Sequence, residues 1–248
     1  MSKPASDSIV QLAALLRDAQ RTVVFTGAGM STESGLPDFR SEGGLWKQNR
    51  RFEELASLDA LHGEYQEFAE FYRWRLQMLE GKEPNRGHAL LANWQRRGLL
   101  SALITQNVDG YHERAGSTGV LNLHGSLRRI HCERCDDEAP LAAFLSSAEP
   151  ACPSCSGKLR PSVVLFGESL DSRVLAEAFQ VSAQADLFLV LGSSLLVSPA
   201  NSLPKIAVER GATLVIINRD PTCYGGLATL DLRASIAETL SAVDRELG

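Results

Sequence analysis

The chain has 248 residues, of which 44% are hydrophobic and 22% are charged, and its formal net charge is −5. This length suits one large domain or a large and a small domain, and the negative charge argues against a general nucleic-acid-binding protein, which is normally basic. No apolar run reaches the length of a membrane span, and residues 1–16 lack a signal-peptide pattern. The cysteine pattern suits a reducing compartment, so we expect a cytoplasmic protein. From the charge and the lack of an apolar span, we expect no direct nucleic-acid partner and no membrane partner.

The first elements along the chain predict a nucleotide-binding turn. Residues 8–19 have a helical apolar period, and residues 22–25 form an apolar, β-branched run that is typical of a buried strand. The segment 27–29 then reads Gly-Ala-Gly, and the hydroxyl residues after it suit a helix start, where free N–H groups bind phosphate. The third glycine of the usual dinucleotide fingerprint is missing, and a lone GxG also occurs in ordinary tight turns. Residues 37–40, Pro-Asp-Phe-Arg, predict a loop that grips a ligand.

The next segments predict a helical insertion and a second strand. Residues 52–80 carry helical periods and no strand signal, and 88–97 reads as another helix. Residues 99–105 form an apolar run that predicts a buried strand. The polar segment 106–109 follows its carboxyl end, where open α/β sheets bind their ligands. An ordinary turn with capping residues is the alternative interpretation.

His124 is the strongest candidate for a general base. It stands between the short apolar run 120–123 and Gly125, so we expect it at a strand end or turn that faces a cleft. An imidazole titrates near neutral pH and can take a proton from a hydroxyl group. Taken alone, a histidine in such a place is more often structural, and the other four histidines are expected to be structural.

The cysteines carry the most specific local signal. Four of the five form two CxxC pairs separated by sixteen residues, namely Cys132, Cys135, Cys152 and Cys155. This spacing predicts a structural zinc ribbon, in which four thiolates close a tetrahedral shell. A redox pair or buried free thiols are the alternative, although a redox site needs only one CxxC. Cys223 is expected to be a packed thiol.

The second half of the chain returns to alternating strands and helices. Residues 160–168 have strand character, buried strands are predicted at 186–191 and 213–217, and helices are predicted at 174–185, 199–209 and 235–247. This alternation predicts an α/β fold with a doubly wound parallel, Rossmann-like sheet. The predicted sheet domain comprises residues 1–40, 86–125 and 160–248. A helical insertion at 41–85 and a zinc-ribbon module at 126–159 form a predicted smaller domain.

Several segments together resemble a known family. They are GAGMSTESGLPDFR (27–40), TQNVDGYHERAGS (105–117), LHG (123–125), the cysteine pairs, RPSVVLFGESL (160–170), GSSLLVSPANSLP (192–204) and INRDPT (217–222). In this order they resemble the sirtuins of bacterial type, a family of NAD-dependent protein-lysine deacylases. The resemblance implies a monomeric enzyme with one structural zinc ion. It implies that acyl groups, acetyl foremost, are removed from lysines of a protein or peptide, with release of nicotinamide and O-acyl-ADP-ribose.

The resemblance also implies a role for each matching residue. His124 would be the catalytic base, and the four paired cysteines would bind the zinc. NAD would contact Gly27, Ala28, Gly29, Thr32, Asp38, Phe39, Arg40, Gln106, Asn107, Val108, Asp109, Gly192, Ser193, Ser194, Asn218 and Ile236. The substrate would add a strand to the protein. It would contact Val163, Leu165, Phe166, Gly167, Glu168, Leu195 and Val197.

Tyr72 and Arg75 stand at i and i+3 on one predicted helix face. In sirtuins that prefer succinyl- or malonyl-lysine, a Tyr and an Arg at this spacing bind the acyl carboxylate, so the pair raises these acyl groups as further substrates. Those relatives usually carry Ala at the place of Thr32 and Thr at the place of Asp38. A plain helix face with a surface arginine is the alternative interpretation.

Three other functions fit parts of the sequence less well. A mono-ADP-ribosyltransferase would use the same NAD site, but it would not need the later proton transfer assigned to His124. A nicotinamide dehydrogenase would need the third fingerprint glycine and a ribose-binding acid after a second strand. A zinc-ribbon binding module without catalysis would leave the polar clusters at the strand ends without a role.

Overall fold

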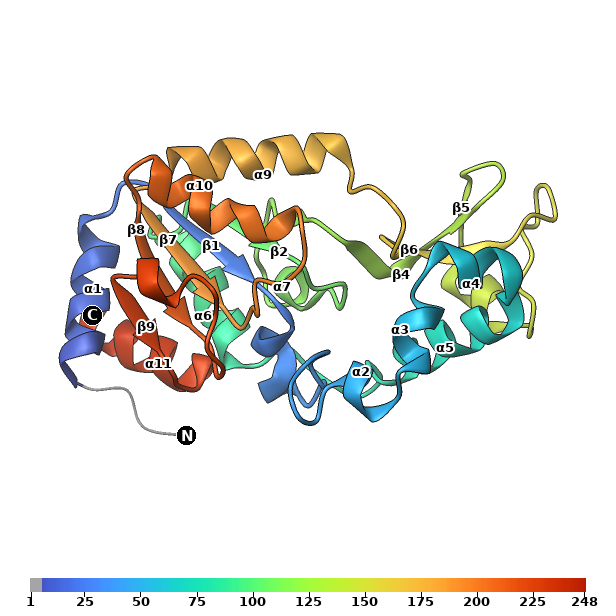
Figure 1. Ribbon diagram of the computed structural model, residues 1–248, viewed down its shortest axis with the longest axis horizontal. Coiled ribbons are helices and arrows are strands. Elements are labelled where there is room, and N and C mark those ends of the chain that lie inside the picture. Colours follow the sequence, from blue (N-terminus) through green and yellow to red (C-terminus); the bar gives the residue numbers. More distant parts are fainter. Residues whose placement is uncertain (1–5) are drawn as a thin grey trace.

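A computed structural model describes residues 6–248. Predictions that fall on residues 1–5, including the first part of the 1–40 range and of the segment without a signal-peptide pattern, lie outside the described residues. The described chain forms a large domain around one sheet and a small domain at its side (Figure 1). None of the helices within residues 6–248 is long and apolar enough to cross a membrane.

The large domain is built on a six-stranded parallel sheet. Its strands, in spatial order, are β3 (Leu121–Asn122), β2 (Ala102–Thr105), β1 (Thr22–Thr26), β7 (Leu187–Leu191), β8 (Thr213–Ile217) and β9 (Leu230–Leu232). Ranked by their order in the chain, these strands run 3-2-1-4-5-6, the doubly wound arrangement of the Rossmann fold. The predicted fold class is confirmed. The sequence reading missed β9, whose three residues are too short for a clear period.

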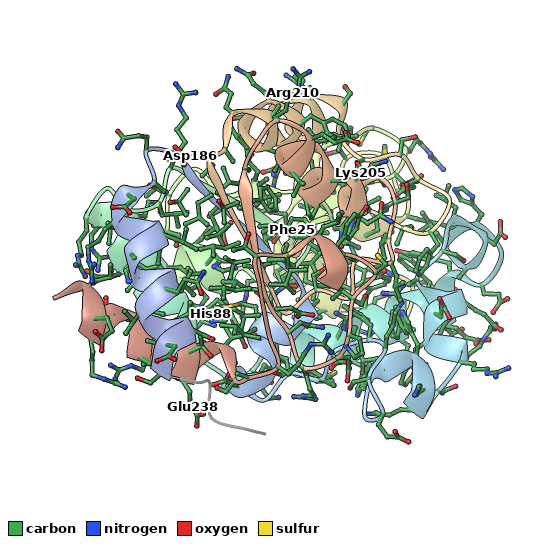
Figure 2. The ribbon with its side chains drawn as sticks, turned by 60° about the vertical axis from the view of Figure 1, so that its left-hand side comes forward. Phe25, His88, Asp186, Lys205, Arg210 and Glu238 are labelled. Atoms are coloured by element: carbon green, nitrogen blue, oxygen red, sulfur yellow. The ribbon has the colours of Figure 1, made fainter. Side chains whose placement is uncertain are left out.

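Helices cover both faces of this sheet, and the strands are therefore apolar on both sides. α1 (Ser6–Asp18), α6 (Arg86–Arg96) and α11 (Ile236–Leu247) pack with Val24 on one face. α9 (Ser172–Gln184) and α10 (Leu203–Glu209) pack with Val23 and Phe25 on the other. Figure 2 shows Phe25 in the interior and Lys205 at the outer surface of α10.

The small domain combines helices with an antiparallel sheet. Its helices are α2 (Leu45–Gln48), α3 (Arg51–Leu55), α4 (Leu58–Gly63), α5 (Tyr65–Gln77) and α8 (Leu141–Leu145). Its three strands, in spatial order, are β5 (Glu138–Ala139), β4 (Gly125–Cys132) and β6 (Leu159–Val163). Residues 160–163 were predicted to belong to the large sheet domain, but they lie in the small sheet as part of β6. β6 pairs with β4 in the small sheet and not with the large one.

The remaining short elements lie around the ends of the parallel strands. They are the 3₁₀ helices η1 (Ala28–Ser34), η2 (Ala200–Ser202) and η3 (Gly225–Leu227) and the single-turn helix α7 (Tyr111–Arg114). The helix expected after the Gly-Ala-Gly turn is therefore the 3₁₀ helix η1.

Candidate active site

A cleft of about 900 Å³ takes its lining from both domains. His124, all sixteen residues predicted to contact NAD, and eight of the nine predicted substrate contacts line this cleft; the exception is Leu195. The fold thus brings together side chains that lie up to about two hundred positions apart in the sequence, Gly27 to Ile236. Their individual roles remain predictions.

The floor of the cleft lies where β1 and β7 are neighbours and the chain connections diverge. Open α/β sheets bind ligands at such a switch point. Gly27 to Gly29 follows β1, and Gly192 follows β7 in the left-handed region at φ 63°. A Cβ at Gly29 would lie 2.7 Å from Gly192 Cα, so neither turn tolerates a side chain here.

The two turns are also joined by backbone hydrogen bonds. Gly29 N–H donates to Gly192 O over 2.8 Å, and Gly27 N–H donates to Leu191 O over 3.0 Å. These two N–H groups therefore hold the turns together and are not free to bind a phosphate. The expected anion site at this turn is smaller than the sequence pattern predicted.

A loop organised by Asp38 covers one side of the cleft. Asp38 Oδ1 accepts hydrogen bonds from the backbone N–H groups of Arg40 at 3.1 Å and Ser41 at 2.8 Å. Phe39 packs on Trp46 with ring centroids 4.8 Å apart. The carboxylate of Asp38 thus shapes the loop, which places the Phe39 ring and Arg40 at the cleft.

A polar pocket follows β2. Ser31 Oγ donates to Asp109 Oδ2 over 2.7 Å, and Asn107 Nδ2 donates to Ser31 Oγ over 3.2 Å. Burial raises the pKa of Asp109, while the hydrogen bonds from Tyr111 N–H and Ser31 oppose that rise. Ser31 was not among the predicted site residues. Its only sequence signal is a hydroxyl two positions after Gly29.

His124 lies after β3 with its ring at the cleft. Its Nδ1 lies 3.0 Å from the carbonyl oxygen of Gln106. A carbonyl can only accept, so Nδ1 carries the proton and Nε2 of the neutral ring is the free basic atom. Burial lowers the pKa of His124, the Gln106 hydrogen bond opposes this, and the charge of Arg40 lowers it further. The His124 imidazole is therefore neutral at neutral pH.

Gly125 fixes where His124 can lie. Its φ is 76°, and a Cβ there would overlap the carbonyl oxygen of Ser162. The backbone can leave β3 and enter β4 at this point only with glycine after the histidine.

Polar side chains from the other half of the sheet line the far part of the cleft. Gln106 Nε2 donates to Ser193 Oγ over 2.8 Å, which links the ends of β2 and β7. Asn218 follows β8, and its Nδ2 donates to the carbonyl of Asp220 over 2.8 Å. Ile236 opens α11 and lines the same region.

The predicted substrate segment after β6 pairs with the small domain. Phe166 N–H donates to Ala56 O over 2.8 Å, and Phe166 O accepts from Leu58 N–H over 3.1 Å. The Phe166 side chain is left 42% exposed at the cleft. The backbone of Phe166 is thus anchored, and its aromatic ring is available to a ligand.

Glu168 is bound within the protein more fully than the sequence suggested. Its carboxylate accepts from Arg160 Nη1 and Nη2 over 2.6 and 2.8 Å and from Leu165 N–H over 2.7 Å. Its own N–H donates to Leu165 O over 3.0 Å. Only its carbonyl remains for the predicted pairing with a substrate backbone.

Leu195 and Cys223 lie differently from what the sequence suggested, although the predicted backbone pairing of Leu195 with a substrate stays a prediction. Leu195 is 2% exposed and packs in the core beneath α9 and α10, whereas its neighbour Leu196 is 63% exposed and lines the cleft. The left-handed backbone at Leu195, with φ 56°, turns the chain at this point. Cys223 is exposed and lines the cleft, so the expectation of a packed thiol was wrong.

Tyr72 and Arg75 lie on α5 and line the cleft together. The Arg75 guanidinium carbon lies 5.1 Å from the centroid of the Phe39 ring and 5.9 Å from that of Phe71. Within residues 6–248, Arg75 has no carboxylate within ion-pair distance. Burial lowers the pKa of Arg75 and raises that of Tyr72.

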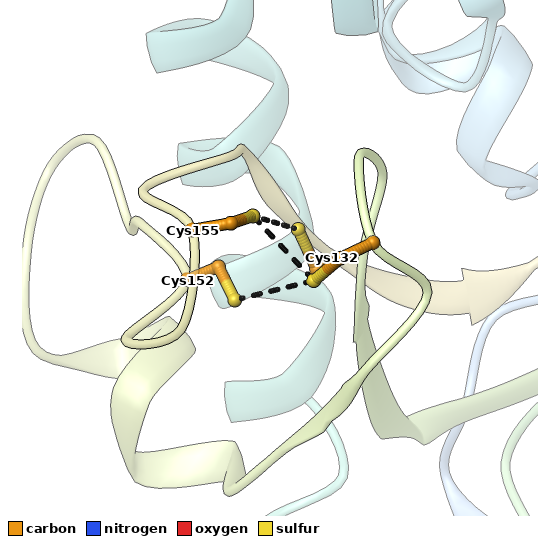
Figure 3. Close-up of side chains that lie close together, drawn as sticks. Cys132, Cys152 and Cys155 are labelled. Atoms are coloured by element: carbon orange, nitrogen blue, oxygen red, sulfur yellow. Dashed lines mark hydrogen bonds between the residues drawn. The ribbon is translucent and has the colours of Figure 1, made fainter.

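The paired cysteines lie close together (Figure 3), and the four form a cluster that is not part of the cleft lining. All four Sγ atoms lie within 4.8 Å of one another. The Sγ atoms of Cys132 and Cys155 are 3.4 Å apart, and those of Cys135 and Cys152 are 3.8 Å apart. Thiolates around a zinc ion at about 2.3 Å would lie roughly 3.8 Å apart, so this donor set fits a tetrahedral zinc ion.

The two knuckles have the same local geometry. Asp136 N–H donates to Cys132 O over 2.9 Å, and Ser156 N–H donates to Cys152 O over 2.8 Å. Asp136 and Ser156 are also both left-handed, at φ 60° and 59°. Each CxxC turn thus presents its two sulfurs to the same centre, as a closed structural site requires.

Comparison with known proteins identifies the family. The model of the Sir2 family matches residues 27–199. The chain belongs to the Sir2 family. A relative from Geobacillus kaustophilus strain HTA426, named NAD-dependent protein deacetylase 1, is 51% identical over 236 residues, which cover 94% of this chain and 96% of the relative. An NAD-dependent protein deacylase from Aeropyrum pernix is 41% identical over 244 residues, which cover 98% of both chains.

Solved structures agree with this assignment. A structure of Sir2 with a p53 peptide and NAD+ has a TM-score of 0.87 and 38% identity, and the match covers 95% of this chain and 97% of that one. A structure of Sir2 bound to acetylated peptide has a TM-score of 0.87 and 36% identity, over 96% and 98% of the two chains. The resemblance to the sirtuins that the motifs gave is therefore confirmed over almost the full length.

Proposed function

We propose that this sirtuin removes acyl groups, acetyl foremost, from lysine residues of proteins, with NAD as co-substrate. The observation that carries the proposal is His124, a neutral histidine whose Nδ1 is held by Gln106 and whose ring lines the cleft. The named relatives are NAD-dependent protein deacetylases and deacylases, which supports the same activity.

When bound, NAD supplies a glycosidic bond to nicotinamide whose cleavage leaves ADP-ribose to accept the acyl group. The Gly27–Gly29 turn and the ends of β7 and β8 would hold the dinucleotide. The amide of Asn107, with Val108 and Asp109, would bind the nicotinamide carboxamide by hydrogen bonds in a buried pocket. His124 would take a proton from a ribose hydroxyl at Nε2.

The substrate would enter as an extended peptide. Phe166 and Leu196, which are 42% and 63% exposed, are the apolar side chains that a lysine stem would cover. Gly167 and Val197 also line the cleft and would offer backbone groups to the peptide, in the manner of an added strand. The zinc would hold the small domain together and would take no part in the reaction, because four thiolates leave no open position.

His124→Ala is the direct test. With a histone-type acetyl-lysine peptide and NAD, we expect its deacetylation rate to fall by at least about a hundred-fold, the lower range for loss of a general base. Circular dichroism should be unchanged. His62→Ala, at a side chain 60% exposed, is the matched control and should retain full activity. Near-native turnover by His124→Ala would contradict the proposal, and a stably ADP-ribosylated protein product would favour the transferase alternative.

We further propose that Arg75 and Tyr72 bind a carboxylate at the end of longer acidic acyl groups. Arg75 lies half-buried at the cleft with no carboxylate in ion-pair distance among residues 6–248, and its contacts with the Phe39 and Phe71 rings hold the guanidinium in place. A charge-assisted hydrogen bond to a succinyl carboxylate would supply the missing partner. The proposal makes succinyl- and malonyl-lysine secondary substrates beside acetyl-lysine.

Arg75→Met tests this acyl preference. We expect kcat/KM for a succinyl-lysine peptide to fall about ten-fold or more, the value of one hydrogen bond to a charged group, with a smaller change for acetyl-lysine. Arg73→Met is the matched control, because Arg73 lies on the same helix and donates to Ser147 O over 2.7 Å. Equal succinyl turnover in wild type and Arg75→Met would show that the pair does not bind the acyl carboxylate.

We also propose a monomeric protein that acts in a reducing, cytoplasmic compartment and binds no nucleic acid directly. The cluster of four reduced cysteines and the net charge of −5 support this. Light scattering after size exclusion tests the monomer, since a mass near twice 26.9 kDa would contradict it.

A further inference from the structure

A buried chain of hydrogen bonds runs from α7 to the backbone at the end of β2. His112 is 1% exposed, and its Nε2 lies 2.9 Å from Thr26 Oγ1. The Thr26 hydroxyl donates to Thr105 Oγ1 over 2.8 Å, and Thr105 Oγ1 accepts from Asn107 N–H over 3.0 Å. Thr26 and Thr105 are register partners at the last position of β1 and β2. This series of hydrogen bonds therefore ends at the backbone N–H of Asn107, a residue that lines the cleft.

One end of these hydrogen bonds has a fixed direction, because Asn107 N–H can only donate to Thr105 Oγ1. The Thr26 and Thr105 hydroxyls can each donate or accept, so they join His112 Nε2 to Thr105 with either tautomer of the ring. Burial lowers the pKa of His112 to about 4, so its ring is neutral at neutral pH. Within residues 6–248, His112 Nδ1 has no hydrogen-bond partner. The bond to Thr26 is thus what orients this imidazole.

The peptide group between Gln106 and Asn107 makes hydrogen bonds to both Thr105 and His124. The Asn107 N–H and the Gln106 carbonyl belong to one planar unit, so neither can rotate without the other. The N–H end of this unit is bound to Thr105, and the carbonyl end is bound to His124 Nδ1 at 3.0 Å. The direction of the carbonyl decides where the His124 ring points.

We propose that Thr105, Thr26 and His112 are positioning residues for His124, acting through the peptide group between Gln106 and Asn107. This rests on the proposed role of His124 as the base. The three side chains are buried, and they do not belong to the residues that line the cleft. They hold the carbonyl that keeps the proton on His124 Nδ1 and leaves Nε2 free.

Substitutions that remove one polar atom at a time test the chain. Thr105→Val removes the acceptor for Asn107 N–H, Thr26→Val removes the next link, and His112→Leu removes the last. We expect kcat to fall by roughly ten- to a hundred-fold in Thr105→Val, the range for a small misplacement of a catalytic group, and by less in each later link. KM for the acetyl-lysine peptide should change little, and Thr26→Ser should recover most of the kcat lost in Thr26→Val.

Thr22→Val is the matched control. Thr22 lies on the same strand, is 1% exposed, and its Oγ1 has no hydrogen-bond partner within residues 6–248. Thr22→Val makes the same replacement of a buried hydroxyl by a methyl group, but it leaves the hydrogen bonds among His112, Thr26 and Thr105 intact. We expect wild-type kcat from it, and an equal loss of kcat in Thr22→Val and Thr26→Val would overturn the proposal.

The pH profile separates positioning from general destabilisation. The Gln106 hydrogen bond raises the pKa of His124 against burial and the charge of Arg40, the charged side chain that faces it. In Thr105→Val the Gln106 carbonyl is held less firmly, its hydrogen bond to His124 weakens, and the pKa of His124 falls. The acid limb of the kcat/KM profile should therefore move to lower pH in Thr105→Val and stay in place in Thr22→Val. An unmoved limb together with unchanged kcat in Thr105→Val would overturn the proposal.

A measurement without turnover distinguishes this inference from the proposed function. The Nδ1–H signal of His124, identified by its loss in His124→Ala, should shift in the NMR spectrum of Thr105→Val and not in that of Thr22→Val. An unshifted signal would overturn the positioning role. A wild-type protein that does not deacylate with NAD would overturn the proposed function alone.

Discussion

The large domain buries both faces of a six-stranded sheet under helices, whereas the small domain surrounds a three-stranded sheet with short helices and a cysteine cluster. The large domain has two apolar cores, one on each side of β1 and β7. The small domain has a single core, in which Cys132 and Cys152 are members. The first domain is thus stabilised mainly by apolar burial, and the second depends on metal ligands and buried charge as well.

Metal removal should separate the two domains most clearly. Incubation with EDTA is expected to increase hydrogen exchange of the amides in residues 132–158, because structural zinc sites contribute about 10 kcal/mol or more to folding. The amides of β1 and β7 should stay protected, because their cores contain no metal ligand. Cys152→Ser should reproduce the effect, and the control Cys223→Ser should bind one zinc normally. Unchanged exchange in residues 132–158 after metal loss would contradict the comparison.

Leu189→Ala probes the large domain. Leu189 is fully buried on β7, so we expect the free energy of unfolding to fall by about 2–5 kcal/mol, the usual cost of such a cavity. Chemical denaturation measures this change. Leu145→Ala, at a side chain 43% exposed in the small domain, is the control and should change stability little. A loss below about 1 kcal/mol for Leu189→Ala would show that apolar burial is not what holds this domain.

Glu168→Gln probes the buried charge of the small domain. Although burial opposes ionisation, hydrogen bonds from Arg160 and Leu165 N–H lower the pKa of Glu168. Its stabilising contribution is therefore fully present above the unfolded-state pKa of about 4.3 and is lost as the pH falls through the folded-state pKa. We expect Glu168→Gln to cost about 1–3 kcal/mol at pH 7, the range for hydrogen bonds to a charged group.

The pH dependence is the sharper part of that experiment. The stability difference between wild type and Glu168→Gln should shrink as the pH is lowered below about 4. Glu138→Gln removes an exposed ion pair with Arg129 and serves as the control, with little effect at either pH. A difference that stays constant down to pH 3 would show that the Glu168 charge does not stabilise the small domain.

Local pattern was enough to predict most of the strands and the cysteine cluster. Long apolar runs such as 187–191 predicted the buried strands, because a strand covered on both faces consists mainly of apolar residues. The two CxxC pairs predicted the cysteine cluster, because such a spacing lets each pair present two thiolates to one centre. His124 was singled out by its place between the apolar run 120–123 and Gly125 and by the family motifs around it, and the structure explains the glycine by its positive φ.

Pairings between distant segments were beyond that pattern. The assignment of β6 to the small sheet depends on its bonds to β4, since an isolated strand does not reveal its partner. The burial of Leu195 in place of Leu196 depends on one left-handed residue. The pairing of Glu168 with Arg160 uses up a carboxylate that the sequence alone left available to a substrate.

The sequence by itself therefore determined the sheet class and the cysteine cluster, and it singled out His124 as the candidate base, since each depends on residues close together along the chain. Only the tertiary structure decided which N–H groups are already used, that Arg75 has no carboxylate within ion-pair distance among residues 6–248, and how Thr26 and Thr105 connect His112 to the peptide group that His124 contacts. Hydrogen-bond partners are decided by distance and direction in space, and neither quantity is contained in the spacing of residues along a chain.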